Sequence, residues 1–239
     1  MVAENLIEVR NRIATACARS GRNPQDVLLV AVSKTFNVAL LREALSVGQL
    51  DFGENYVQEL TSKQKAVGDP NVRWHYIGHL QSNKAKYIAD FVSLIHSVDS
   101  EHLARELEKR AEKANRSIEI LLEVHTTNEA TKSGIQPAKA IELAKAISSL
   151  KRVKIQGLMT MGPFSENAND SRPAFRQLSE LGRKIEGEGI DNVAMRHLSM
   201  GMSNDFEIAI EEGATIVRIG TAIFGKRNTA LNEQTEGVL

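Results

Sequence analysis

A lysine at the end of an unbroken apolar run is the first residue of this chain with evident chemical potential. Residues 27–32 read Val-Leu-Leu-Val-Ala-Val, and Ser33, Lys34 and Thr35 follow directly. Such a run is typical of a parallel strand that is buried on both faces. A lysine in apolar surroundings has its ammonium form disfavoured by desolvation, so that its neutral amine becomes a nucleophile for aldehydes. The ordinary alternative is a strand-end lysine that points into solvent.

Two later segments combine glycine with hydroxyl residues just before stretches of helical pattern. They read His-Leu-Ser-Met-Gly-Met-Ser over residues 197–203 and Arg-Ile-Gly-Thr-Ala-Ile-Phe-Gly over residues 218–225. Gly220 permits close approach of the backbone, as does Gly201. Ser203 and Thr221 can offer hydroxyl groups beside amides at helix N-termini, which favour anions. We therefore expect a phosphate site here, while ordinary helix capping by the same hydroxyl groups is compatible with it.

Three other kinds of site have little support in the sequence. Residues 220–226 nearly match a nucleotide phosphate loop, but Arg227 stands where serine or threonine must bind magnesium. His75 and His79 have a zinc-binding spacing only on a helix, and their segment reads as strand and turn without a third ligand. There is also no G-x-S-x-G elbow or nucleophilic cysteine pattern. A nucleotide, metal or hydrolase site is therefore disfavoured.

The elements that must position these residues alternate regularly between strand and helix. A helix is expected first, over residues 4–20. Strands are expected at residues 27–34, 50–53, 72–77, 91–98, 118–124, 153–159, 193–198 and 214–219. Helices are expected between them at residues 38–47, 55–66, 83–89, 100–114, 137–150, 172–186 and 204–212, with a short helical piece at the end.

About eight strand–helix units in a chain close to ~250 residues predict a single (β/α)8 barrel of the TIM type with an extra N-terminal helix. The alternative is an open doubly wound sheet. We prefer the barrel because no linker or change of composition divides residues 1–239 into domains. Catalytic and binding residues of such barrels lie at the C-terminal ends of the strands. The polar tail after about residue 226 is expected to fray.

Composition excludes several classes of partner. The chain has 239 residues, of which 42% are hydrophobic and 25% charged, the ordinary mixture of a globular protein. A formal net charge of +0 removes the electrostatic argument for nucleic acid or an anionic membrane. The single cysteine, Cys17, is expected in the core. Because no signal-peptide pattern or membrane-spanning run is present, we expect a cytoplasmic protein.

Several longer motifs together resemble one known family. They are residues 30–35 (VAVSKT), 52–59 (FGENYVQE), 74–84 (WHYIGHLQSNK), 158–161 (LMTM), 198–205 (LSMGMSND) and 217–225 (VRIGTAIFG). In this order and spacing they resemble the YggS/PROSC family of pyridoxal phosphate homeostasis proteins. One departure is Asn37, where many members have proline soon after the lysine motif. This difference affects the rigidity of the loop more than its chemistry.

The resemblance implies a fold similar to the N-terminal barrel domain of bacterial alanine racemase and pyridoxal 5′-phosphate as the cofactor. The residues that it assigns to the cofactor are Lys34 as the Schiff base, Arg218 facing the pyridine nitrogen, Ser203, Gly220 and Thr221 at the phosphate, and Asn55, Ser199 and Met200 nearby. Arginine stays charged and only donates hydrogen bonds, so it favours an unprotonated ring nitrogen and weakens carbanion stabilisation. A weak electron sink suits racemisation with a second base, or no catalysis.

The expected function is therefore that of a carrier of the cofactor. Racemases of the related fold have a second β domain that supplies a tyrosine base, whereas Tyr56, Tyr76 and Tyr87 all lie in early units of this chain. We expect a non-catalytic monomer that holds pyridoxal phosphate, takes part in its intracellular homeostasis and passes it to dependent apoenzymes. The alternatives are a small pyridoxal-phosphate-dependent amino-acid racemase and a structural partner protein without cofactor.

Overall fold

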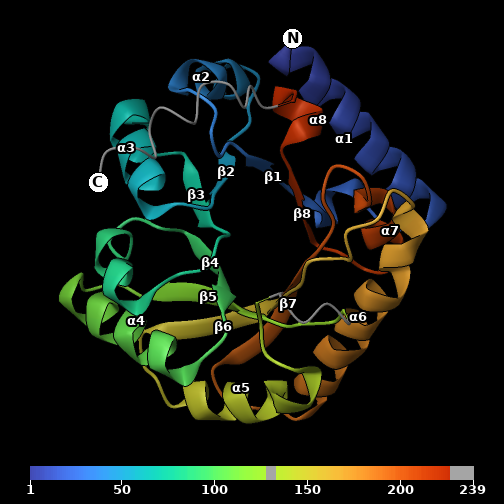
Figure 1. Ribbon diagram of the computed structural model, residues 1–239. Coiled ribbons are helices and arrows are strands. Elements are labelled where there is room, and N and C mark those ends of the chain that lie inside the picture. The colour runs from blue at the N-terminus through green and yellow to red at the C-terminus, as the bar shows by residue number, and fades with distance from the viewer. Residues whose placement is uncertain (128–132, 227–239) are drawn as a thin grey trace.

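Eight parallel strands close into a barrel in the computed structural model, which describes residues 1–127 and 133–226 (Figure 1). Each strand pairs with the next along the chain, and the last pairs with the first. The closed barrel is therefore confirmed, and the open sheet is wrong. The strands are β1 (Leu28–Val32), β2 (Asp51–Glu54), β3 (Arg73–Tyr76), β4 (Leu94–Val98), β5 (Ile118–Glu123), β6 (Val153–Met159), β7 (Val193–Ser199) and β8 (Ile216–Ile219).

Helices surround the barrel on its outer face (Figure 1). They are α2 (Val38–Ser46), α3 (Val57–Val67), α4 (Glu101–Lys113), α5 (Ala140–Ser148), α6 (Arg172–Gly187), α7 (Phe206–Glu211) and α8 (Thr221–Phe224). The extra N-terminal helix α1 (Val2–Arg19) packs against α7, α8 and α2. Its buried face includes Leu6, Ile13 and Cys17, which confirms a core position for the cysteine. Because α8 is short, α1 covers the barrel beside it.

Short 3-10 helices replace or extend some of the expected α-helices. The segment between β3 and β4 forms η2 (Ser82–Tyr87), where the Lys84 N–H donates to the Gln81 carbonyl oxygen. The expected helix at residues 137–150 begins with η3 (Pro137–Lys139) before α5. The remaining two are η1 (Pro24–Asp26) and η4 (Ala168–Ser171). Apolar periodicity does not distinguish a short 3-10 helix from one α-helical turn.

The protein has two apolar clusters, one inside the barrel and one around it. A small apolar cluster fills part of the barrel interior, formed by Val30, Leu94, Leu121, Met159 and Ile216. The larger apolar core lies between the strands and the surrounding helices. Buried polar side chains also occur on the strands, so they must find hydrogen-bond partners inside the barrel.

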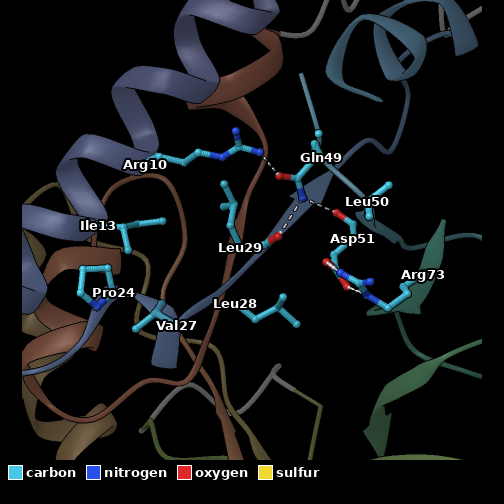
Figure 2. Close-up of a pocket in the computed structure, with 11 residues that line it drawn as sticks. Arg10, Ile13, Pro24, Val27, Leu28, Leu29, Gln49, Leu50, Asp51 and Arg73 are labelled. Atoms are coloured by element: carbon cyan, nitrogen blue, oxygen red, sulfur yellow. Dashed lines mark hydrogen bonds and ion pairs between the residues drawn. The ribbon is translucent and has the colours of Figure 1, made fainter. Parts of the chain in front are cut away.

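The N-terminal ends of β1, β2 and β3 surround a cavity of about 280 Å³ (Figure 2). The Gln49 amide nitrogen donates to the carbonyl oxygens of Leu29 and Asp51, at 2.8 Å each. Its amide oxygen accepts from Arg10 at 3.3 Å. Arg73 forms an ion pair with the Asp51 carboxylate between neighbouring strands. This end of the barrel is therefore joined by polar contacts between side chains and backbone.

The expectations about membrane-spanning segments and the C-terminal tail concern the ends and surface of the chain. No helix among the described residues is long and apolar enough to cross a membrane. The tail that was expected to fray after residue 226 lies outside the described residues.

Candidate functional site

A cavity of about 570 Å³ opens at the C-terminal ends of the strands, opposite the cavity of Figure 2. Its walls come from the ends of β1 and β8 and from the segments after β1, β2, β3, β6, β7 and β8. Six of the eight residues predicted for the cofactor line it, namely Lys34, Asn55, Ser203, Arg218, Gly220 and Thr221. The cavity therefore brings together residues that are up to 187 positions apart, from 34 to 221.

Lys34 lies in a tight turn that directly follows β1. The Phe36 N–H donates to the Ser33 carbonyl oxygen at 3.0 Å. Between them, Thr35 has a φ of 68°, in the left-handed region that a β-branched residue rarely adopts. Its N–H donates to Glu59 Oε1 at 2.6 Å. Since this backbone conformation is unfavourable by itself, neighbouring contacts must hold the turn that presents the lysine.

Three charged residues, which we call the turn clamp, supply these contacts: Glu54 of β2 and Glu59 and Lys63 of α3. The Lys63 ammonium donates to the Ser33 carbonyl oxygen at 2.6 Å, to Glu54 at 2.7 Å and to Glu59 at 2.6 Å. The Ser33 hydroxyl also donates to Glu54, at 2.6 Å. Burial raises the pKa of Glu54 to about 7, although the ion pair with Lys63 opposes this. The turn is thus attached to both β2 and α3.

The loops before α7 and α8 meet at another wall of the cavity. The Ala222 N–H donates to Ser203 Oγ at 3.3 Å and so links the two loops. A Cβ atom on Gly220 would lie 3.0 Å from the Val32 carbonyl oxygen, which explains why glycine fits this close approach to β1. The hydroxyl groups of Ser203 and Thr221 therefore line the same cavity as the lysine.

Arg218 of β8 lines the cavity and is nevertheless buried. Its guanidinium donates to Ser199 Oγ at 2.6 Å and to the Thr160 carbonyl oxygen at 2.9 Å. Burial lowers the pKa of Arg218 to about 10, and the negative charges of Asp205 and Glu123 oppose the shift. The group remains a cation at neutral pH and offers only hydrogen-bond donors.

Two of the predicted residues stand apart from the cavity lining. Ser199 is fully buried, and its hydroxyl lies between Arg218 and the imidazole of His96. Met200 is also fully buried and belongs to the outer core between strands and helices. Ser199 is therefore linked to the cavity lining through Arg218, whereas Met200 packs in the core behind it.

The histidines and tyrosines do not line the cavity. All six histidines and all three tyrosines of the chain lie among the described residues, and none is part of the lining. His75 points into the hydrogen-bonded barrel interior, whereas the carbonyl oxygen of His79 accepts from the Tyr76 hydroxyl. The described residues contain no group of three or more histidine, cysteine, aspartate or glutamate residues that could hold a metal ion.

Comparison with known proteins now places the chain. The model of the alanine racemase N-terminal domain matches residues 5–228. A pyridoxal phosphate homeostasis protein of Aquifex aeolicus is 48% identical over 224 residues, which cover 94% of this chain and 97% of the relative. The protein of the same name from Escherichia coli K12 is 40% identical over 233 residues, covering 95% and 97%. The chain belongs to the pyridoxal phosphate homeostasis protein family.

Solved structures agree with this family and with the fold. PipY of Synechococcus elongatus, solved with pyridoxal phosphate bound, is 36% identical to this chain and superposes with a TM-score of 0.82. The match covers 94% of this chain and 100% of the PipY chain. Alanine racemase of Clostridium difficile is 12% identical with a TM-score of 0.74, and the match covers 57% of its length. The second likeness shows the barrel fold alone.

The turn clamp is the part of the site that the sequence motifs did not predict. Glu54 and Glu59 lie in a motif that carries the family resemblance, but the motif gave them no role. Lys63 lies outside every motif, and its buried ammonium is visible only once α3 packs beside β2. A lysine on the buried face of an expected helix was the available signal, since lysine is rarely buried unless it is paired.

Proposed function

We propose that this chain is a cytoplasmic, monomeric protein that binds pyridoxal 5′-phosphate through a Schiff base with Lys34 and takes part in cofactor homeostasis. The observation that carries the proposal is the shared cavity, in which a lysine, a buried arginine and two hydroxyl residues converge. The names of the relatives and the PipY structure with pyridoxal phosphate support the choice of cofactor.

The residues of the cavity fit the separate parts of this cofactor. The Lys34 amine matches the aldehyde, and the Ser203 and Thr221 hydroxyl groups match a phosphate that the backbone at Gly220 can approach closely. Arg218 offers a donor to the pyridine nitrogen. When bound, the cofactor supplies an electrophilic aldehyde and an electron-withdrawing ring. An arginine beside the ring nitrogen keeps that nitrogen unprotonated and so weakens electron withdrawal.

The other residues that line the cavity favour binding of the cofactor over catalysis. Proton transfer on two faces of a substrate needs a second acid or base near the lysine. No histidine or tyrosine lines the described cavity, but two carboxylates do, Glu166 and Asp205. The Glu166 side chain is exposed to solvent on the loop after β6. The Asp205 carboxylate already accepts from the Ser171 hydroxyl and from the Met202 N–H, at 2.7 Å each. We therefore assign Lys34 the role of holding the aldehyde until it passes to dependent apoenzymes.

Absorption spectroscopy with chemical trapping tests the proposal. Purified protein mixed with pyridoxal phosphate should show a visible band, and borohydride reduction should fix a phosphopyridoxyl group on the peptide that contains Lys34. Lys34→Ala should lose both signals. Lys84→Ala, which changes a half-buried lysine outside the cavity, should keep them. A colourless wild-type protein, or an adduct on another lysine alone, would refute the binding role.

A panel of amino acids separates the carrier from a small racemase. Loaded protein should show no turnover near ordinary enzyme rates of about 1–10³ s⁻¹. Turnover in that range that disappears in Lys34→Ala would show that the protein is an enzyme.

A further inference from the structure

A continuous series of hydrogen bonds crosses the barrel interior behind the cavity. We call Asp51, His75, His96, Ser199 and Arg218 the interior network; they lie on β2, β3, β4, β7 and β8. All five side chains are buried. Successive members are in contact: Arg218 Nη1 to Ser199 Oγ is 2.6 Å, Ser199 Oγ to His96 Nδ1 is 2.9 Å, His96 Nε2 to His75 Nδ1 is 3.0 Å, and His75 Nε2 to Asp51 Oδ1 is 3.0 Å.

The two ends of this network fix the direction of every bond. A guanidinium only donates and an ionised carboxylate only accepts. Because Ser199 Oγ accepts from Arg218, its own proton must go to His96 Nδ1. The His96 proton then resides on Nε2 and is donated to His75 Nδ1. The His75 proton likewise resides on Nε2 and is donated to Asp51.

The opposite direction fails at the serine. If His75 carried a proton on Nδ1, it would donate that proton to His96 Nε2. His96 would then have its own proton on Nδ1 and would donate it to Ser199 Oγ. That oxygen would receive two donors, and its proton would have no acceptor among the described residues, a cost of about 1–3 kcal/mol. The environment of His96 agrees, because burial and the neighbouring His75, Arg218 and His197 lower its pKa well below the usual range.

We propose that Asp51, His75, His96 and Ser199 are positioning residues that hold the Arg218 guanidinium in one orientation at the cavity. Arg218 needs such support because its hydrogen bonds to the protein go to two neutral oxygens, of Ser199 and Thr160. The far end of the network is itself anchored, since Arg73 pairs with the Asp51 carboxylate (Figure 2). The orientation of Arg218 is thereby set from the opposite end of the barrel.

Nuclear magnetic resonance of the cofactor-free protein tests the direction of the bonds. Nitrogen-15 signals of the imidazoles should show a proton on Nε2 of both His75 and His96 and none on Nδ1 of either ring. A proton on Nδ1 of either ring, or a charged His96, would overturn the proposal. This measurement needs neither a variant nor the cofactor, so it stands apart from the proposed function.

The guanidinium signals of Arg218 test positioning. Wild-type protein should give resolved, slowly exchanging Nη signals. In Ser199→Ala, faster rotation of the guanidinium should merge the Nη signals into an averaged one. In His96→Phe, the Nη protons should exchange faster than in wild type, but less so than in Ser199→Ala. The matched control is His197→Phe, which changes a neighbouring histidine outside the network and should leave the signals unchanged. If the Arg218 Nη signals of His96→Phe matched those of wild type, only Ser199 would position Arg218, and the proposed network would be wrong. If the signals of both variants matched wild type, neither residue would position Arg218.

A cofactor readout follows and rests on the proposed function. In Ser199→Ala and His96→Phe, the visible band of bound pyridoxal phosphate should shift, while borohydride should still trap the cofactor on Lys34. An unshifted band together with altered guanidinium signals would mean that Arg218 does not face the ring. In wild-type protein without any band, the proposed function fails while the resonance tests still decide the network.

Discussion

At the residue scale, the buried Glu123 should make the stability of the folded protein depend on pH. This carboxyl group ends β5 and is buried. Burial raises its pKa to about 7, the negative charge of Asp99 adds to the rise, and the positive charge of Arg218 opposes it. The folded state therefore binds the proton more tightly than the unfolded state, whose ordinary pKa is 4.5. Its stabilising contribution is complete below about pH 4.5 and is lost as the pH rises to about 7.

Glu123→Gln should remove this dependence because the amide does not titrate. A shift of this size corresponds to about 3 kcal/mol, so the wild-type free energy of unfolding should fall relative to the variant between pH 4.5 and pH 7 by up to that amount. Urea unfolding at several pH values measures the difference. Glu119→Gln, an exposed change on the same strand, is the matched control. Parallel curves for wild type and Glu123→Gln would contradict the prediction.

The hydroxyl residues of the two loops give a second prediction at this scale. A hydrogen bond to a charged group contributes about 1.5–3 kcal/mol, so replacing Ser203 and Thr221 by alanine should weaken cofactor binding by roughly 100-fold or more. Equilibrium dialysis of the double variant measures this. Ser165→Ala is the control, because Ser165 also lines the cavity while its hydroxyl donates to Asp170. Unchanged retention in the double variant would exclude these hydroxyl groups from the phosphate site.

At the scale of elements, the turn clamp connects α3 to the turn that carries Lys34. Lys63→Met should remove the donor shared by the Ser33 carbonyl oxygen, Glu54 and Glu59, and should destabilise the protein by about 1–3 kcal/mol at neutral pH, where the buried Glu54 then takes up a proton. Adding Glu54→Gln should recover stability mainly at high pH, where Glu54 would otherwise ionise without a counter-charge. Denaturant unfolding of the single and double variants measures both effects. Lys65→Met changes an exposed lysine of the same helix and should have little effect. A single variant as stable as wild type would contradict the clamp.

Local patterns predicted the elements well because strands and helices have short periods. The strand at residues 153–159 was placed at the bounds that β6 adopts, and Ser100 caps α4 through a bond from the Leu103 N–H. Lys34, Ser203 and Thr221 could be proposed from sequence because each follows a strand-like segment. The pairing of His96 with Ser199 could not, because 103 residues separate them and only barrel closure brings them together.

At the scale of the whole molecule, barrel closure places the two cavities at opposite ends of one interior. The N-terminal ends of β1, β2 and β3 surround the cavity of Figure 2, and the C-terminal ends open into the candidate cofactor cavity. The interior network joins these ends through buried side chains of five strands. Arg73, which is half exposed, pairs with the Asp51 end of this network, so the proposed positioning of Arg218 extends to the surface at the opposite end of the barrel.

The surface of the whole molecule predicts a monomer. A closed barrel leaves no sheet edge for a second copy to extend. Of the exposed large apolar side chains of the described residues, Phe164 and Met202 both line the candidate cofactor cavity, whereas Ile7 of α1 and Tyr87 at the end of η2 lie on other segments. Stable dimers instead bury large contiguous apolar surfaces. Light scattering after size-exclusion chromatography should therefore give the chain mass of 26.3 kDa, with and without pyridoxal phosphate. Twice that mass at micromolar concentration would contradict the monomer.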